Sequence, residues 1–457
     1  MPVARQQHEP RVDDTGEGGS GSLNSHRFDT WKAKIADSGE RSGRTGTAVR
    51  TDSFDVVYDS DSERSLPDNV ISLQDSFSDN DLESESIPDL QLDLAELKRQ
   101  ASKSVGAFCT NATRLCSGSY HEIFVLDFQQ PQEGHDTCTS ERVPSSCIAR
   151  CARTSEPIEH GRSTIATMRY VKAHTDLPVP CIFYADVDPN NKVGAPYVLM
   201  EKLPGETLAS IWDDLSLAHK KAVVAQIAGL LQQLASLEFA KIGCLQDEGV
   251  GPLYPMHWSG QPHGPFQTSA DYLTSFISDE TVSGPEEKAM LREVSSIVRD
   301  AASSVLLEPP FRLIHADFDR QNLMFTTHGS QEPRLSGIID WDHAYTGPLY
   351  YLFDYPIFLQ DVDGRKDLYF ENKVLRQHLV RSLQEQYPDD AAMRDRVRRC
   401  FSEKTYELNE FFNLFVAEER DSPITHARAY LRDIKGCSGT AYSGRIDYKP
   451  EEIDSID

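Results

Sequence analysis

The sequence lacks any long hydrophobic run. A membrane-spanning helix needs about 18 consecutive apolar residues, and the best candidate, 222–231, is short and interrupted by Gln226. Residues 1–40 contain no apolar segment of the kind that a secretory signal carries. We therefore expect a protein with no membrane role and an intracellular, cytoplasmic location.

Spaced cysteine clusters and a nucleophile motif are also missing. The nine cysteines include no C-x-x-C and no His/Cys cluster with zinc spacing; the closest pair, Cys147 and Cys151, lies in a strand-like stretch. This pattern favours reduced thiols over disulfides or zinc. No G-x-S-x-G occurs, which leaves a serine hydrolase of that type unsupported.

Basic residues are few. The chain has 46 Lys+Arg against 72 Asp+Glu, a formal net charge of −26, which disfavours binding to nucleic acid. Residues 51–93 hold 13 Asp or Glu and one basic residue, Arg64. We predict that residues 1–88 are a disordered, acidic, Ser-rich tail, because they cannot bury enough apolar surface to offset the entropy of ordering. Such a tail serves either as a solvating segment or as an arm for a protein partner.

The remaining chain divides into a sheet-rich part and a helix-rich part, an α+β architecture. In 89–203 the patterns predict helices at 90–99 and 163–174, and strands at 122–128, 146–152, 179–184 and 196–200. In 204–435 they predict helices at 218–237, 271–277, 286–306, 368–386, 391–417 and 423–434, with short apolar segments at 311–315 and 335–341. Residues 436–457 look irregular.

Two segments in the second part combine an apolar strand with acidic residues. Residues 315–322 read H-A-D-F-D-R-Q-N and follow the apolar 311–314, and residues 337–342 read G-I-I-D-W-D. They supply Asp317, then Asn322, then Asp340. Phosphoryl transfer to a hydroxyl needs one carboxylate to accept a proton, and an amide oxygen and a second carboxylate to hold Mg²⁺ against phosphate. This spacing therefore indicates a phosphotransferase.

These segments resemble those of the aminoglycoside phosphotransferase family, and more narrowly its fungal members, whose acceptors are undefined. The first matches the family's H-x-D-x-x-x-x-N loop, and the second its I-I-D-W-[DE] segment. Residues 194–205 resemble the G-x-P-Y-I-L-M-E-x-x-x-G hinge. The resemblance covers about 105–435 and implies a bilobal, protein-kinase-like fold. In that fold a small sheet lobe with one helix and a larger helical lobe hold ATP between them.

The resemblance also implies a role for each matching residue. By position, these are Asp317 as the catalytic base; Asn322 and Asp340 as Mg²⁺ ligands; Arg150 as the basic strand residue that contacts the α- and β-phosphates; Glu201 and Leu203 in the hinge that contacts adenine; and Gly118 and Ser119 in the loop that covers the phosphates.

One position departs from the family pattern. In the related pattern S-E-x-A-T-M a helix Glu pairs with the basic strand residue, whereas residues 163–168 read S-T-I-A-T-M and place Thr164 there. Glu156 and Glu159 are the alternative carboxylates, although Pro157 disfavours a continuous helix back to Glu156. Two hypotheses follow: a small-molecule kinase dependent on ATP and Mg²⁺, or a catalytically weak or dead binding or scaffold protein. The acceptor stays open among aminoglycosides, choline, sugars, amino alcohols and a protein hydroxyl.

The neighbouring residues have plainer interpretations. We expect His315 to bond the backbone beneath the 315–322 loop, because a strand-to-loop histidine is more often structural than a general base. Asp342 is either a side chain that supports the site or a surface acid.

Overall fold

The computed structural model describes residues 89–118, 120–130, 143–153, 157–254, 262–277, 282, 284–327, 329, 331–361, 365–402, 406–416 and 423–436. They belong to one compact unit within 86–457. The predicted tail 1–88, the irregular 437–457 and Ser119 lie outside the described residues.

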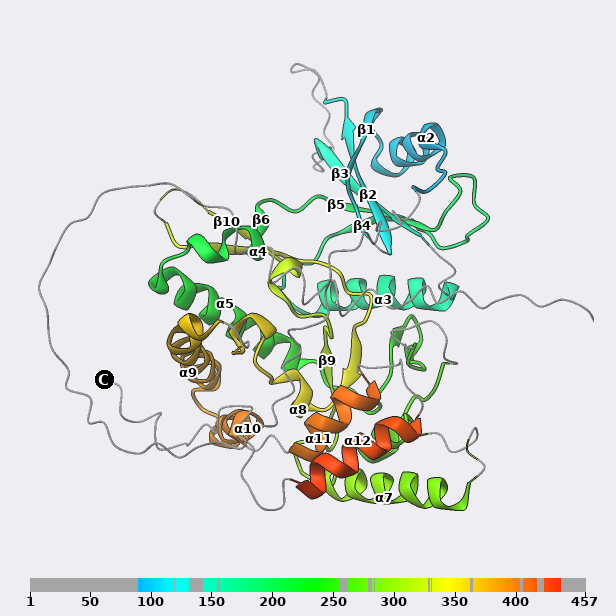
Figure 1. Ribbon diagram of the computed structural model, residues 1–457. Coiled ribbons are helices and arrows are strands. Elements are labelled where there is room, and N and C mark those ends of the chain that lie inside the picture. The colour runs from blue at the N-terminus through cyan, green and yellow to red at the C-terminus, as the bar shows by residue number, and fades with distance from the viewer. Residues whose placement is uncertain are drawn as a thin grey trace, which may run out of the picture. The chain divides into compact units, whose positions relative to one another are not determined.

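An antiparallel five-stranded sheet forms the N-terminal part (Figure 1). Its order is β1-β2-β3-β5-β4. β2 and β3 alternate buried and half-buried residues, as expected of strands with one face on a core. The bounds are β1 Cys109–Ser117, β2 His121–Phe128, β3 Ser146–Ala152, β4 Ile182–Asp186 and β5 Tyr197–Glu201.

The sequence predicted β2, β3 and β5 and missed β1. β1 is an edge strand whose residues are mostly exposed and polar, so it carries no apolar signal. β4 begins at Ile182 and not at residue 179. The reason is that Pro178 and Pro180 have no N–H to donate to a ladder.

Two helices accompany the sheet. α2 (Leu94–Val105) begins at Asp93, whose side chain accepts a hydrogen bond from the Glu96 amide, so the helix starts later than predicted. It packs Leu97 with Leu126 and Leu199 of the sheet. α3 (Ile158–His174) begins directly after Pro157.

The inner side of α3 belongs to the large C-terminal core. Met168 and Val171 are buried in the same cluster as the long helices of the C-terminal part. α3 also lies against β7 (Leu245–Gln246). The helix also contacts β4, so it lies between the sheet and the helical part of the molecule (Figure 1).

The C-terminal part is mainly helical, as predicted. α5 packs on α9, and α7, α11 and α12 lie together (Figure 1). The predicted helix 391–417 contains α10, α11 and, directly after α11, a π-helical turn at Phe412–Val416, while residues 403–405 and 417 lie outside the described residues. The helices are α4 Leu208–Ile211, α5 Leu217–Ser236, α6 Ser269–Thr274, α7 Pro285–Ala301, α8 Leu349–Leu352, α9 Tyr369–Glu385, α10 Ala391–Ser402, α11 Tyr406–Phe411 and α12 Pro423–Gly436. None of the helices in the described ranges is long and apolar enough to cross a bilayer.

Short strands support the segments with the acidic motifs. β9 is antiparallel to β12, and a second small sheet has the order β11-β10-β6. The bounds are β6 Glu206–Thr207, β8 Gly249–Val250, β9 Arg312–Ile314, β10 Leu323–Thr326, β11 Arg334–Ile338 and β12 Tyr345–Gly347. The 315–322 loop therefore runs from β9 to β10, and β11 leads into the 339–342 segment.

Candidate functional site

His315 anchors the loop that follows β9. The side chain is buried, and its Nε2 lies 3.0 Å from the carbonyl oxygen of Ile339. A carbonyl only accepts, so Nε2 donates. The ring also contacts Trp341, with the centroids 4.6 Å apart. Burial lowers the pKa of His315, which keeps the ring neutral near pH 7. His315 thus bonds the backbone beneath the loop, as the sequence predicted.

Asp317 and Asn322 are joined within the loop. The Asn322 amide nitrogen donates to the backbone oxygen of Asp317 at 2.8 Å and to its carboxylate Oδ2 at 2.9 Å. Because the amide nitrogen makes both bonds to Asp317, the Asn322 oxygen, an acceptor only, takes no part in them. Asn322 is buried, so its orientation is fixed by packing as well as by these bonds.

Asp340 reaches the same place through the backbone. The Ile339 amide donates to the Asn322 carbonyl at 3.0 Å, which puts Asp340 next to Asn322. Among the described residues, the non-glycine residues with positive φ are Ala316 (65°) and Asp340 (63°). Such a conformation costs about 1–3 kcal/mol and clusters at functional sites. Ala316 directly precedes the predicted base Asp317, and Asp340 is itself a predicted metal ligand, so both left-handed residues belong to the predicted site.

The donor set fits a magnesium ion. An amide oxygen and a carboxylate are oxygen ligands of the type that Mg²⁺ takes, and substrate phosphates and water complete its shell. In the described ranges, no group of three or more His, Cys, Asp or Glu forms a metal cluster. A two-ligand protein site completed by phosphate is consistent with that finding.

Arg150 extends from β3 across to the 340–342 segment. Its guanidinium donates to Asp340 Oδ1 at 3.0 Å and to both carboxylate oxygens of Asp342, one of them at 2.8 Å. The Arg150 side chain is 15% exposed, Asp342 9% and Asp340 37%. The contact with Asp342 is therefore the more buried one, and it is bidentate.

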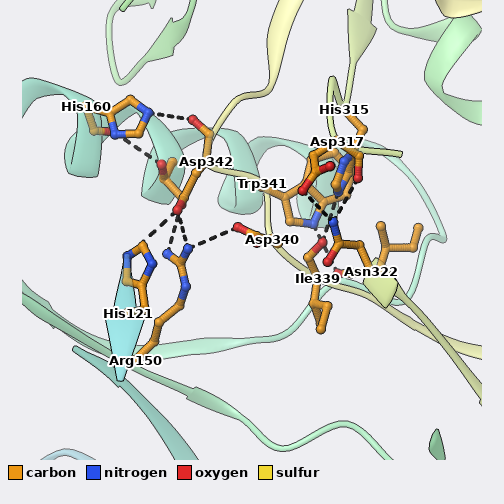
Figure 2. Close-up of polar contacts among 12 residues, drawn as sticks. His121, Arg150, His160, His315, Asp317, Asn322, Ile339, Asp340, Trp341 and Asp342 are labelled. Carbon is orange, nitrogen blue, oxygen red and sulfur yellow. Dashed lines mark hydrogen bonds and ion pairs between the residues drawn. The ribbon is translucent and has the colours of Figure 1, made fainter. Parts of the chain in front are cut away.

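Asp342 is the centre of this cluster (Figure 2). His160 of α3 lies with Nε2 2.6 Å from the Asp342 carbonyl oxygen, and His121 of β2 lies with Nε2 3.8 Å from its carboxylate. Burial and the adjacent Arg150 lower the pKa of His121 to about 3, so this imidazole is neutral near pH 7. Burial alone would raise the pKa of Asp342, but Arg150 holds it well below its usual range.

Sequence reasoning named no role for His160 or His121 and left Asp342 open. These residues are separated along the chain by 182 residues (His160 to Asp342) and 192 residues (Arg150 to Asp342), so no local spacing reports their contact. The available signal was the missing helix carboxylate at Thr164, whose hydroxyl instead donates to the His160 carbonyl at 3.3 Å.

The hinge residues lie on β5 and directly after it. The Glu201 carboxylate accepts from the Cys181 amide at 3.0 Å, so the side chain is held beside the start of β4. A Cβ on Gly337 would lie 2.4 Å from Leu203, which shows how closely the hinge approaches β11. Gly205 has φ of 95°, and a Cβ there would lie 2.3 Å from the Phe325 carbonyl oxygen.

Gly118 occupies the turn between β1 and β2, and Ser119 lies outside the described residues. The Gly118 amide donates to the His121 carbonyl at 2.8 Å. Arg153, after β3, contacts Ser117 and forms an ion pair with Glu122 at 2.8 Å. The turn is thus tied to the strand that carries Arg150.

Comparison with known protein families finds a match over the middle of the chain. Residues 129–353 match the profile of the phosphotransferase enzyme family. That segment contains Arg150, the hinge, the 315–322 loop and the 339–342 segment.

Two fungal proteins are similar over shorter stretches. A subtelomeric hrmA-associated cluster protein of Aspergillus fumigatus is 29% identical over 138 residues, which is 30% of this chain and 25% of that protein. Altered inheritance of mitochondria protein 9, mitochondrial, of Candida tropicalis is 32% identical over 134 residues, 28% of this chain and 20% of that protein. The match spans a quarter or less of the length of these curated relatives.

Solved structures with a similar trace include aminoglycoside phosphotransferases. A thermostable mutant of APH(4)-Ia, in a ternary complex with AMP-PNP and hygromycin B, is 16% identical and aligns over 76% of this chain and 99% of that chain, with a TM-score of 0.42. The streptomycin-ATP-APH(2")-IIa ternary complex is 15% identical over 76% of this chain and 97% of that chain, with a TM-score of 0.43.

Proposed function

We propose that the chain, which belongs to the phosphotransferase enzyme family by the match over residues 129–353, transfers the γ-phosphoryl group of ATP to a hydroxyl of a small molecule. The observation that carries this proposal is the set Asp317, Asn322 and Asp340. Side-chain and backbone hydrogen bonds of 2.8–3.0 Å hold these residues together.

Each residue has a distinct part in the proposed reaction. Asp317 accepts the proton of the acceptor hydroxyl and orients that oxygen toward the phosphorus. Asn322 and Asp340 provide oxygen ligands for Mg²⁺, which when bound neutralises charge on the transferring phosphate. Arg150 adds a positive charge beside the same phosphates. Backbone groups from Glu201 to Leu203 hold adenine, and the turn at Gly118 and Ser119 covers the phosphates.

The test is an acceptor screen with ATP and Mg²⁺. Candidate hydroxyl compounds, among them aminoglycosides, choline, sugars and amino alcohols, are incubated with wild type and with Asp317→Asn. Mass spectrometry then detects the addition of one phosphoryl group. The proposal expects a phosphorylated product whose rate falls about 10²–10⁴-fold in Asp317→Asn. Equal rates in the two proteins would reject Asp317 as the base.

The lobe boundaries, the subgroup of the family, the cellular location and the role of the acidic tail belong to the same proposal. The division into an N-lobe at 89–203 and a C-lobe at 204–435 assigns nucleotide to the junction of the two. We place the protein among the fungal members of the family, in the cytoplasm, with the acidic tail available to a protein partner. A truncation lacking residues 1–88 is expected to keep transferase activity, because no proposed site residue lies there.

A second candidate is a kinase-like binding or scaffold protein of weak or no catalysis. Thr164 favours it, because the helix position of the pairing Glu holds no carboxylate. The bridging of Arg150 to Asp340 favours it too, since a cation would compete for that carboxylate. Nucleotide binding without phosphoryl transfer to any acceptor or to water would support this candidate over the kinase.

A further inference from the structure

Arg150 lies on β3 of the sheet, and α3 packs between the sheet and the helical part of the molecule. In protein kinases the corresponding basic residue pairs with a Glu of the helix, and activity requires that pair. Here the helix position holds Thr164, whose hydroxyl is engaged by the His160 carbonyl. A different group therefore has to hold Arg150 toward the nucleotide site.

We propose that Asp342 replaces the missing helix carboxylate as the positioning partner of Arg150, and that His160 fastens α3 to the same residue. This inference rests on the proposed function, which it deepens. Both oxygens of the Asp342 carboxylate accept from Arg150, and the Asp342 backbone oxygen accepts from His160 (Figure 2). One residue thus links the sheet, the helix and the metal-binding segment.

Burial separates the roles of the two aspartates. Asp342 is 9% exposed and meets Arg150 with two oxygens, whereas Asp340 is 37% exposed and meets it with one. When a cation takes Asp340, the single contact at 3.0 Å is given up and the bidentate contact stays. Arg150 then keeps its direction while Asp340 becomes a metal ligand. Asp342 is consequently a positioning residue and not a ligand.

The space beside Thr164 allows a test in which a carboxylate is introduced on α3 as the partner of Arg150. A cavity of about 50 Å³ lies between α3 and the sheet and is lined by Arg150, Gly161, Thr164 and Asp342, among others. A Glu at position 164 would enter this cavity on the side of Arg150. The double variant Asp342→Asn/Thr164→Glu therefore restores a carboxylate partner from the helix.

The experiment measures the dissociation constants of Mg-ATP and of adenosine for wild type, Asp342→Asn, Thr164→Glu and the double variant. Asp271→Asn is the matched control, because it breaks an exposed Asp–Arg pair elsewhere in the C-terminal part. We expect Asp342→Asn to weaken Mg-ATP binding at least tenfold, with adenosine binding changed less than twofold. The double variant should return to within threefold of wild type, and the control should stay at the wild-type value.

A general loss of folding would behave differently. It would weaken adenosine and Mg-ATP equally, and Thr164→Glu would rescue neither. Either that result or unchanged Mg-ATP binding in Asp342→Asn would overturn the proposal.

A second readout needs no nucleotide. Hydrogen exchange of the α3 amides is compared in wild type, His160→Phe, Asp342→Asn and the double variant. We expect exchange at 158–164 to speed up at least fivefold in His160→Phe, which loses the bond to the Asp342 carbonyl, and in Asp342→Asn, where the segment that carries this carbonyl loses its anchor on Arg150. Exchange should slow again in the double variant. If wild type bound no nucleotide, the proposed function would fail, and this pattern alone would decide the role of Asp342. Unchanged exchange in both single variants would reject it.

Discussion

The candidate site has two halves. The C-terminal half, which contains Asp317, Asn322 and Asp340, is held by backbone bonds and packing, whereas the N-terminal half, which contains Arg150, is held by charged side chains. Asp317, Asn322 and Asp340 are linked by bonds in which the backbone takes part, around the buried rings of His315 and Trp341. Arg150 is held by the carboxylates of Asp340 and Asp342, which belong to the C-terminal half. The first arrangement is fixed by folding, whereas the second depends on ionisation and on whatever else binds those carboxylates.

The difference teaches where control can act on such a site. A backbone-held loop keeps its geometry with or without a ligand, because its bonds are internal. A charge-held arginine responds to every added cation or anion nearby. The N-terminal half is therefore the half in which nucleotide and metal would alter geometry, and the predictions below probe each half separately.

The largest expected effect on stability comes from removing the indole ring of Trp341, which packs beneath the C-terminal half of the site. Trp341 is 1% exposed, donates from its indole to the Ile338 carbonyl at 3.1 Å and contacts His315. Trp341→Ala should lower the free energy of unfolding by about 3–5 kcal/mol, measured by urea denaturation. It should also weaken Mg-ATP binding, because the Asp340 backbone loses its support.

Phe411→Ala is the control for that variant, since Phe411 is equally buried but belongs to α11. It should cost a comparable free energy and leave Mg-ATP affinity unchanged. A cost below about 1 kcal/mol for Trp341→Ala would show that packing does not hold this half.

The N-terminal half should be next in magnitude. Arg150→Met leaves the Asp342 carboxylate buried without its bidentate partner, so we expect a loss of about 3 kcal/mol in the free energy of unfolding. Arg150→Met/Asp342→Leu should recover most of that loss, because the double variant removes the unpaired charge as well. Denaturant unfolding at pH 7 measures both. Strictly additive losses would argue that the two side chains do not interact.

A smaller gain in stability is expected from the backbone at position 316. Ala316 has φ of 65°, which glycine adopts without strain. Ala316→Gly should raise the free energy of unfolding by about 1 kcal/mol, seen as a higher melting temperature. Ala228→Gly in α5 is the control and should lower it by about 1 kcal/mol. Should both variants be destabilised alike, position 316 is not strained.

The smallest effect concerns an ion pair within a single helix. Hydrogen bonds from Arg99 and Gln100 lower the pKa of Glu96 in α2 to about 2 from 4.5. Since the folded-state pKa is depressed, the stabilisation is present above pH 4.5 and is lost as the pH falls toward 2.

That sign gives a test by circular dichroism or hydrogen exchange of α2 during an acid titration. Glu96→Gln should remove the pH dependence of α2 in this window and change little at pH 7. High salt should weaken the Glu96–Arg99 pair more than the buried Arg150–Asp342 pair. An equal response of the two pairs to salt would remove the distinction between surface and buried charge.

Much of the fold follows from local patterns. The alternating β2 and β3 and the long α5 and α9 were predicted because their burial repeats with the period of the element. The polar edge strand β1 carries no such pattern. The π-helical turn at Phe412–Val416 was missed because the apolar spacing of the predicted helix continues through it.

The site divides in the same way. Asp317, Asn322 and Asp340 could be named because the consecutive strands β9, β10 and β11 set their spacing along the chain. Asp342, His160 and His121 could not be given roles, because they meet through tertiary packing between segments more than 180 residues apart. Thr164 showed that a partner for Arg150 was missing, but only the three-dimensional arrangement identifies which carboxylate supplies it.

The most direct test of the central claim is a thermal-unfolding titration with ATP, with and without Mg²⁺, on wild type and Asp340→Asn. ATP at about 100 times its dissociation constant adds about 2.7 kcal/mol of stability. The account predicts stabilisation that requires Mg²⁺ in wild type and is lost in Asp340→Asn, while the two ligand-free proteins unfold within a few degrees of each other. Stabilisation of equal size in both proteins, or none in wild type, would contradict a nucleotide and metal site built on Asp317, Asn322 and Asp340.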